Sequence, residues 1–296
     1  MENTKHKAGF VNIIGNPNVG KSTLMNALVG EKLSIITPKA QTTRHRIMGI
    51  VNGEDFQIVY SDTPGILKPN YKLQQSMMDF VHGALKDADI ILYVTDATEE
   101  EFLEEDFIHK LKTTGIPIIL LINKIDAVGA NKSLEKVMYW KKQFPKAEVM
   151  PVSALQKLNT DLLLQKIISL LPEHPAYFDK EELTDKTERF FSAEIIREKI
   201  LMNCHQEIPY SSEVVVTEFI DEPKIIRIRA EIVIERDSQK GIIIGHKGAL
   251  IKKIGTEARI DIESFTGKKV FLELFVKVDK DWRNNESRLK QYGYSQ

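Results

Sequence analysis

Residues 15–22 read Gly15-Asn16-Pro17-Asn18-Val19-Gly20-Lys21-Ser22, and this stretch decides the fold of the N-terminal part of the chain. It matches the pattern GxxxxGK[ST], directly after an apolar run at 8–14 and directly before an amphipathic stretch at 21–29. Glycines let the backbone curl so that successive N–H groups and a helix N-terminus face a phosphate. We therefore predict a phosphate-binding loop between a strand and a helix.

The side chains of this loop point to a nucleoside triphosphate with Mg²⁺. Lys21 offers a mobile positive charge to the β- and γ-phosphates, which makes it the candidate catalytic residue, and the Ser22 hydroxyl can hold Mg²⁺. Asp62-Thr63-Pro64-Gly65 follows a second strand, where the Asp62 carboxylate can reach Mg²⁺ through water and the Gly65 N–H can approach a γ-phosphate. We assign the phosphate contacts to residues 15–22, Thr23 and Gly65.

The surrounding pattern predicts an α/β domain. Apolar runs predict strands near 8–14, 47–51, 56–60, 90–95, 116–122 and 147–152. Amphipathic segments predict helices near 21–29, 73–86, 101–113, 131–143 and 159–171. This alternation favours a mostly parallel sheet with helices on both faces. Asn52-Gly53-Glu54 predicts a tight hairpin, so one strand pair is expected to be antiparallel.

Base recognition is predicted at Asn123-Lys124-Ile125-Asp126, which follows a buried strand. The Asp126 carboxylate can accept two hydrogen bonds from guanine N1–H and N2–H₂, donors that adenine does not present in that arrangement. An adenine nucleotide would leave buried polar groups unpaired at a cost of about 1–3 kcal/mol. We expect Asn123 to brace the loop, the Lys124 stem to cover the base, and backbone N–H groups at Ser153 and Ala154 to reach guanine O6.

In this order the motifs resemble the translation-factor-like branch of P-loop GTPases. The resemblance adds a mobile switch at 31–46, in which either Thr42 or Thr43 completes the Mg²⁺ shell. Ile66 follows Gly65 where Ras-like GTPases carry a water-positioning glutamine, and an isoleucine cannot orient water. We therefore expect slow intrinsic GTP hydrolysis, with Asn18 as a candidate ligand for K⁺ beside the phosphates.

The C-terminal part differs in composition. The stretch from Pro172 to Asp185 has two prolines and five acidic residues, and we interpret 173–186 as a linker. The formal charge is +1 over 1–172, −8 over 173–223 and +6 over 224–296. Patterning then predicts a helix at 187–203, strands at 213–220, 225–234 and 269–278, and, after a short helix, a long helix at 248–265.

Gly245-His246-Lys247-Gly248 lies between the two helices of this α-β-β-α-α-β order, which resembles a type II KH domain. Such a loop clamps single-stranded RNA, because glycines allow close approach of the sugar-phosphate backbone. We assign RNA contacts to residues 245–248, Lys252 and Lys253, with Lys240 and Arg236 as further phosphate partners. The spacing of the aromatic residues favours core positions over base stacking for Phe265, Phe271, Phe275 and Trp282.

Over essentially its whole length the chain resembles the bacterial Era GTPase family, through QTTRHRI, IIIGHKGALIKKIG and KKVFLELFVKVDKDWR. The resemblance implies a GTPase domain at 1–172, a linker at 173–186 and a KH domain at 187–296. It implies a GTP-dependent switch that binds the 3′ end of small-subunit (16S) ribosomal RNA and assists assembly of the 30S subunit, and it allows a loose, peripheral association with the inner membrane. The alternative is an RNA-binding protein in which the nucleotide state matters little.

Composition agrees with a two-domain intracellular protein. The chain has 296 residues, one cysteine and a formal charge of −1. A lone thiol, Cys204, excludes an internal disulfide framework and suits a reducing compartment. The longest apolar run, 116–122, is too short to span a membrane. We expect a cytoplasmic monomer that uses GTP, GDP and Mg²⁺.

Overall fold

The computed structural model describes residues 6–98 and 105–294, which form two compact units. The first unit comprises Met1–Ser34, Thr43–Lys68 and Met77–Asp185. The second comprises Ile35–Thr42, Pro69–Ser76 and Lys186–Gln296. Two short segments from the N-terminal half of the sequence therefore belong, by their contacts, to the C-terminal unit.

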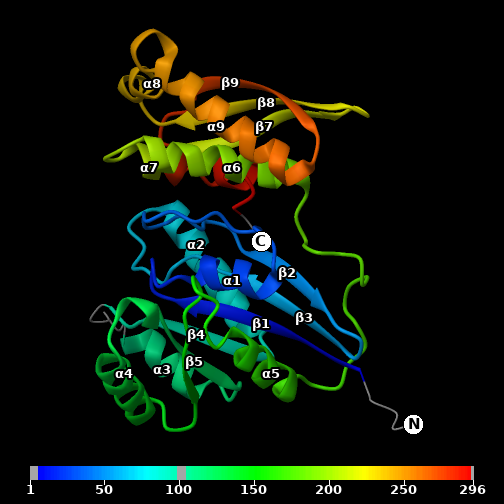
Figure 1. Ribbon diagram of the computed structural model, residues 1–296. Coiled ribbons are helices and arrows are strands. Elements are labelled where there is room, and N and C mark those ends of the chain that lie inside the picture. The colour runs from blue at the N-terminus through cyan, green and yellow to red at the C-terminus, as the bar shows by residue number, and fades with distance from the viewer. Residues whose placement is uncertain (1–5, 99–104, 295–296) are drawn as a thin grey trace. The chain divides into compact units, whose positions relative to one another are not determined.

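The first unit is built on one six-stranded sheet (Figure 1). Its strands are β1 (Lys7–Gly15), β2 (Ile47–Asn52), β3 (Phe56–Asp62), β4 (Ile90–Asp96), β5 (Ile118–Asn123) and β6 (Glu148–Pro151). Their order across the sheet is β2-β3-β1-β4-β5-β6. Every neighbouring pair is parallel except β2 and β3. The predicted hairpin is confirmed, and the Gly53 N–H closes its turn onto the Phe56 carbonyl at 2.8 Å.

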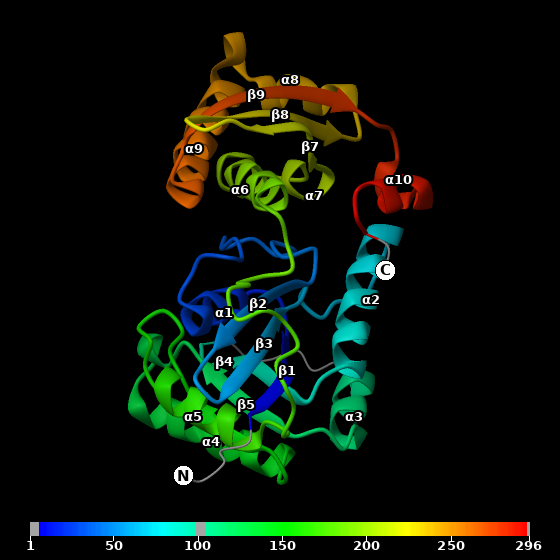
Figure 2. The ribbon, with the colours of Figure 1, turned by 90° about the vertical axis from the view of Figure 1, so that its right-hand side faces the viewer.

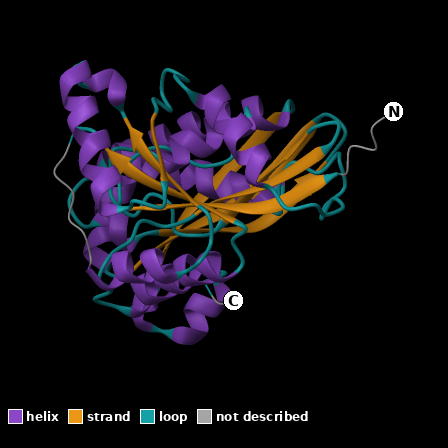
Figure 3. Cartoon of the chain, turned by 90° about the horizontal axis from the view of Figure 1, so that it is seen from below, coloured by secondary structure: helices purple, strands orange, loops and turns teal. Residues whose placement is uncertain are grey.

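Helices cover both faces of this sheet, and strands form the layer between helices (Figures 2 and 3). They are α1 (Lys21–Val29), α2 (Lys72–Lys86), α3 (Glu105–Thr113), α4 (Ala130–Gln143), α5 (Thr160–Leu170) and the single turn η1 (Ile125–Ala127). Apolar side chains of α2, α3 and α4 share one buried cluster with β4 and β5. The three-layer α/β prediction is confirmed. The expected start of α3 at 101–104 lies outside the described residues.

The acidic stretch after α5 follows the outer edge of the sheet. The Ile50 N–H donates to the Leu183 carbonyl at 2.8 Å, and the Thr184 hydroxyl donates to the Met48 carbonyl at 2.6 Å. The Gln57 side chain accepts hydrogen bonds from the N–H groups of Tyr177 and Phe178. Residues 173–185 are therefore attached to β2 and β3 by specific bonds, which shield the outer edge of β2.

The second unit has the predicted α-β-β-α-α-β order. Its main elements are α6 (Glu188–Asn203), β7 (Glu213–Asp221), β8 (Ile225–Ile234), α8 (Asp237–Ile244), α9 (Ala249–Thr266) and β9 (Lys269–Val278). Short helices α7 (Ile208–Ser211), η2 (His246–Gly248), η3 (Trp282–Asn284) and α10 (Glu286–Gln291) complete it. β8 is central, antiparallel to β7 and parallel to β9. The short helices α7, η3 and α10 were not predicted.

One face of this sheet packs against α6 and α9. The predicted alternation in β8 is confirmed, because its core positions are all at most 2% exposed: Ile226, Ile228, Ala230, Ile232 and Ile234. The expectation that the aromatic residues are core is right for Trp282, whose Nε1 donates to the Ser211 carbonyl at 3.1 Å. It is wrong for three others, Phe265, Phe271 and Phe275, which are exposed.

The exposed phenylalanines of β9 have a physical explanation. They point to the outer face of the sheet, where the side chains of Arg227 and Arg229 cover the rings of Phe271 and Phe275. A guanidinium over an aromatic face is attractive without a second layer of apolar residues. Sequence spacing identifies the side of a strand on which a residue lies, but it does not show whether that side is covered.

Candidate functional site

The loop from Gly15 to Gly20 joins β1 to α1 and is shaped by close approaches that only glycine permits. A Cβ at Gly15 would lie 2.2 Å from the Val94 carbonyl oxygen. A Cβ at Gly20, whose φ is +94°, would lie 2.3 Å from Asn123 Nδ2. The loop is therefore pressed against the ends of β4 and β5, with Asn18 at its exposed tip in a left-handed conformation.

Lys21 begins α1 and curls back over the loop. Its Nζ donates to the carbonyls of Gly15 at 3.0 Å and Asn16 at 2.7 Å. Burial lowers the pKa of Lys21 to about 8, although the nearby Asp62 carboxyl opposes this shift. A buried ammonium held against the carbonyls of this loop gains greatly from an added anion, since little water screens it.

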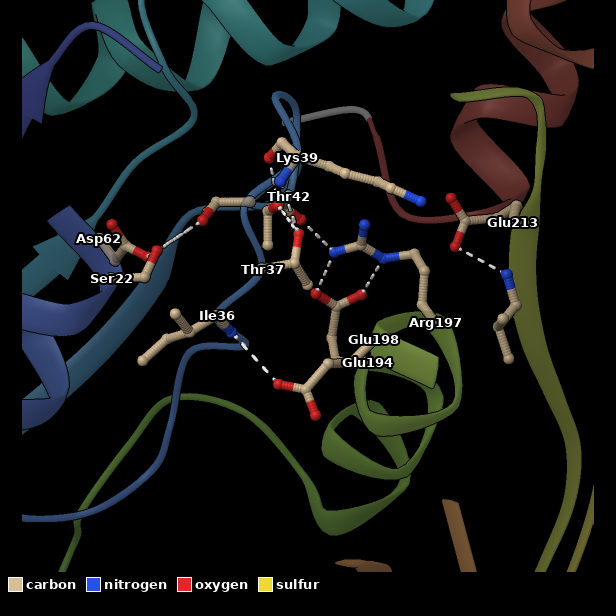
Figure 4. Close-up of polar contacts among 12 residues, drawn as sticks. Ser22, Ile36, Thr37, Lys39, Thr42, Asp62, Glu194, Arg197, Glu198 and Glu213 are labelled. Carbon is tan, nitrogen blue, oxygen red and sulfur yellow. Dashed lines mark hydrogen bonds and ion pairs between the residues drawn. The ribbon is translucent and has the colours of Figure 1, made fainter. Parts of the chain in front are cut away.

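Ser22, Thr43 and Asp62 meet beside this loop, and Figure 4 shows the contact of Ser22 with Asp62. The Ser22 hydroxyl donates to Asp62 Oδ2 at 2.7 Å and lies 2.9 Å from Thr43 Oγ1, which is itself 3.2 Å from Asp62 Oδ2. Burial raises the pKa of Asp62, against the opposing effects of Lys21 and neighbouring hydroxyls. The second carboxylate oxygen, Oδ1, is buried and has no hydrogen-bond partner among residues 6–98 and 105–294.

These oxygens fit a magnesium ion. Hydroxyl and carboxylate oxygens are the ligands that Mg²⁺ prefers, and a cation would stabilise the ionised form of the buried carboxyl. Thr42, the other candidate, is not brought to this cluster, because its hydroxyl donates to the Lys39 carbonyl and lies 2.6 Å from Thr37 Oγ1. The structure therefore separates the two adjacent threonines.

The segment after Asp62 packs directly on the phosphate loop. A Cβ at Gly65 would lie 2.8 Å from Pro17 Cα, and the Ile66 N–H donates to the Gly15 carbonyl at 3.1 Å. Ile66 is 6% exposed and belongs to the core beneath α2. Its side chain therefore points away from solvent.

Asn123 braces the base-recognition loop, as expected. Its Nδ2 donates to the Val19 carbonyl at 2.9 Å, and its Oδ1 accepts from the Ala154 N–H at 2.9 Å. The Ser153 N–H donates to the Leu158 carbonyl at 3.1 Å. Both N–H groups thus tie the loops together in this structure, and the contact of Ser153 and Ala154 with guanine O6 stays a prediction.

The other two loop residues lie at the surface. Asp126 is exposed, and Lys124 adopts a left-handed conformation with φ of +63°. Lys124 Nζ forms an ion pair with Asp96 Oδ2 at 2.5 Å. Burial raises the pKa of Asp96, but Lys124 and Thr98 lower it more, so it lies below the ordinary value. Sequence reasoning missed Asp96, although a carboxylate at the end of β4 was the available signal.

In the second unit the GxxG loop forms the single turn η2 at the start of α9. A Cβ at Gly245 would lie 2.8 Å from Leu250 Cβ, while Gly248 has a φ of +79° and precedes the first residue of α9. His246 and Lys247 are exposed between these glycines. Lys252 and Lys253, one turn later, and Arg236 and Lys240, on or next to α8, are also exposed. The positive end of an 18-residue helix thus lies beside exposed cationic side chains.

The mostly parallel sheet, its phosphate loop and its base loop define a P-loop GTPase, and the second unit has the fold of a type II KH domain. A family model described as "50S ribosome-binding GTPase" matches residues 10–124, and a KH domain model matches residues 207–283. The chain belongs to the GTPase Era family.

Similarity to members of this family extends over the whole chain. GTPase Era of Geotalea daltonii is 46% identical over 99% of this chain and 100% of its own length. GTPase Era of Staphylococcus haemolyticus is 44% identical over 98% of each chain. A crystal structure of Era with MgGDPNP and nucleotides 1506–1542 of 16S ribosomal RNA has a TM-score of 0.94 and 40% identity, over 98% of this chain and 100% of that one. A crystal structure of an Aquifex aeolicus Era variant bound to GDP·AlF4⁻ has the same TM-score, identity and coverage.

No helix within the described ranges 6–98 and 105–294 is both long enough and apolar enough to cross a bilayer.

Proposed function

We propose that this GTPase uses its KH domain to bind the 3′ end of small-subunit (16S) ribosomal RNA and to assist assembly of the 30S subunit in the cytoplasm. The observation that carries the proposal is the GxxG turn at 245–248, held at the start of α9 with exposed lysines around it. A relative of the same fold is known in complex with that region of the RNA. We propose domain limits of 1–172 and 187–296, joined by the acidic stretch at 173–186.

We assign the nucleotide site residue by residue. The backbone of 15–20 and the ammonium of Lys21 bind the phosphates, while Ser22, Thr43 and Asp62 would hold Mg²⁺. The bound ion would offset negative charge on the phosphate oxygens. Asp126 recognises guanine. Lys124 flanks the base and is held there by its ion pair with Asp96. Ser153 and Ala154 line the other side of the base site, where Asn123 fixes their loop by its hydrogen bond to the Ala154 N–H.

Hydrolysis in this site relies on electrostatic stabilisation. Lys21 places positive charge beside the β- and γ-phosphate oxygens, where negative charge develops as the bond between the γ-phosphate and GDP breaks, and its burial strengthens that interaction. The apolar Ile66 provides no group to orient the attacking water, and we therefore expect a slow intrinsic rate. We propose Asn18 as a K⁺ ligand. If this is right, hydrolysis is faster in KCl than in NaCl, and Asn18→Ala removes the difference; equal rates of the wild type in both salts would exclude it.

The test of the proposed function is GTP hydrolysis in KCl buffer, with and without an oligonucleotide that matches the 3′ end of 16S ribosomal RNA. The matched control is Gly248→Asp, because it adds a negative charge and a side chain at a left-handed position. We expect the oligonucleotide to bind and to change the hydrolysis rate of the wild type only. Binding without a change in rate would favour an uncoupled RNA-binding protein, and absence of binding would refute the proposal.

A further inference from the structure

Residues 35–42 precede the candidate magnesium ligand Thr43, yet they belong to the second unit with α6. The segment is held together by its own bonds: Thr42 Oγ1 donates to the Lys39 carbonyl, and the Lys39 N–H donates to Thr37 Oγ1 at 3.1 Å. These internal bonds make residues 37–42 a small folded turn, so contacts with neighbouring elements set its position.

Helix α6 holds this turn at separate points along its length (Figure 4). The Ile36 N–H donates to Glu198 Oε1 at 3.3 Å. Lys39 Nζ donates to the carbonyls of Leu201 and Cys204, at the C-terminal end of the helix. A lysine there is favourable, because the last carbonyls of a helix lack partners within the helix and carry partial negative charge.

The third contact is the most informative. Arg197 Nη2 donates to the carbonyl of Thr42, whose oxygen belongs to the same peptide unit as the N–H of Thr43. A peptide unit is planar and rigid, so a grip on its oxygen restricts the orientation of the Thr43 backbone as well. The side chain of Thr43 leaves that backbone to lie 2.9 Å from Ser22 Oγ and 3.2 Å from Asp62 Oδ2.

Arg197 is built to hold a fixed position. It is fully buried, and its Nε and Nη2 donate to both carboxylate oxygens of Glu194 at 2.7 and 2.6 Å. Burial lowers the pKa of Arg197, but Glu194 raises it more, so the guanidinium stays charged. A bidentate Arg–carboxylate pair fixes the plane of the guanidinium and aims its remaining donors.

We propose that Arg197, on the first helix of the KH domain, is a positioning residue for GTP hydrolysis. By holding the Thr42 carbonyl it sets the orientation of Thr43 toward Mg²⁺. A change in α6 when the KH domain binds RNA would reach the nucleotide site through this peptide. The inference rests on the assignment of Thr43 as a magnesium ligand, so the experiment tests both separately.

The experiment is a double-mutant cycle on the full chain with Arg197→Lys and Thr43→Ala. The first readout is the Mg²⁺ concentration that half-saturates the complex with the non-hydrolysable analogue GDPNP, and the second is the rate of GTP hydrolysis. We expect Arg197→Lys alone to raise the Mg²⁺ requirement and lower the rate by about tenfold each, since small misplacements of positioning groups are costly. In the Thr43→Ala background, Arg197→Lys should change the Mg²⁺ requirement and the hydrolysis rate by less than about twofold, because both residues act on the same step.

The matched control is Arg259→Lys, which alters an arginine of α9 that pairs with Glu263 of the same helix at 2.9 Å. It should leave both readouts unchanged. If Arg197→Lys does not fold, as judged by thermal melting, Arg197→Met with Glu194→Met replaces the buried ion pair by apolar groups, which is often tolerated. That pair should show the same loss.

The outcomes separate the two ideas. If Thr43→Ala leaves the Mg²⁺ requirement unchanged, the proposed magnesium site is wrong. Two other outcomes keep the magnesium site and refute the role of Arg197. In one, Thr43→Ala raises the Mg²⁺ requirement but Arg197→Lys has no effect. In the other, the effects of the two substitutions are independent, so that their fold-changes multiply in the double variant.

Discussion

Gly20 and Asn123 approach each other so closely that any side chain at Gly20 would displace Asn123. A Cβ at Gly20 would lie 2.3 Å from Asn123 Nδ2, the atom that donates to the Val19 carbonyl. The glycine that turns the phosphate loop into α1 therefore also makes room for the residue that braces the base loop. We therefore expect phosphate binding and base recognition to depend on the same contact.

Gly20→Ala should therefore disable nucleotide binding and lower the free energy of unfolding by about 1–3 kcal/mol. Gly30→Ala is the matched control, since Gly30 has a similar φ of +87° but nothing described lies within 4 Å of its Cβ position. It should show only the backbone strain and retain GDP affinity. Calorimetric GDP binding and thermal melting measure both effects, and equal losses in the two variants would contradict the contact argument.

Thr43 and Thr42 provide a second matched pair. Thr43→Ala should slow Mg²⁺-dependent hydrolysis at least about tenfold, because it removes an oxygen from the cluster of Ser22 and Asp62. Thr42→Ala removes a hydroxyl that bonds within its own turn and keeps the carbonyl that Arg197 holds, so its effect should stay within about threefold. Steady-state hydrolysis at several Mg²⁺ concentrations decides this, and a larger loss for Thr42→Ala would reverse the assignment.

Asp126→Ala should reduce the preference for GTP over ATP. The carboxylate is expected to accept hydrogen bonds that only guanine donates, so its removal should cost GTP binding about 1–3 kcal/mol and leave weak ATP binding unchanged. Competition of both nucleotides against labelled GDP measures the ratio. Asp161→Ala, an exposed acid in the first turn of α5, serves as the control. Unaltered discrimination would place base recognition elsewhere.

The low pKa of Lys21 predicts a pH dependence of nucleotide binding. In the free protein burial lowers this pKa to about 8, and a bound phosphate should raise it by favouring the charged ammonium. Binding then takes up protons above about pH 8, so affinity is constant below that pH and falls as the pH rises further, by at most about tenfold per unit. Calorimetry at about pH 8.5 in buffers of different ionisation enthalpy measures the uptake. Lys21→Met should show no proton uptake on binding. If this variant takes up as many protons as the wild type, another group binds the proton.

Much of the fold and the site could be predicted because the signals are local. In 15–22, 62–65 and 123–126 the order of residues within one loop places the glycines, hydroxyls and carboxylates near one another whatever the rest of the chain does. The alternation of strands and helices likewise follows from spacing, as the buried positions of β8 show. The α-β-β-α-α-β order also follows from spacing, whereas the KH assignment of the GxxG turn depends on resemblance to a known family.

Tertiary structure alone decided the points that depend on contacts across long separations in the chain. Thr42 and Thr43 are adjacent and chemically identical, so sequence could not choose between them. The choice follows from Ser22 and Asp62 on one side and from Arg197, 155 residues away, on the other. The exposure of Phe271 and the membership of 35–42 in the second unit also depend on contacts between residues far apart in the chain. Sequence spacing determines which residues share a loop or a face, whereas burial and long-range hydrogen bonds determine which of them meet.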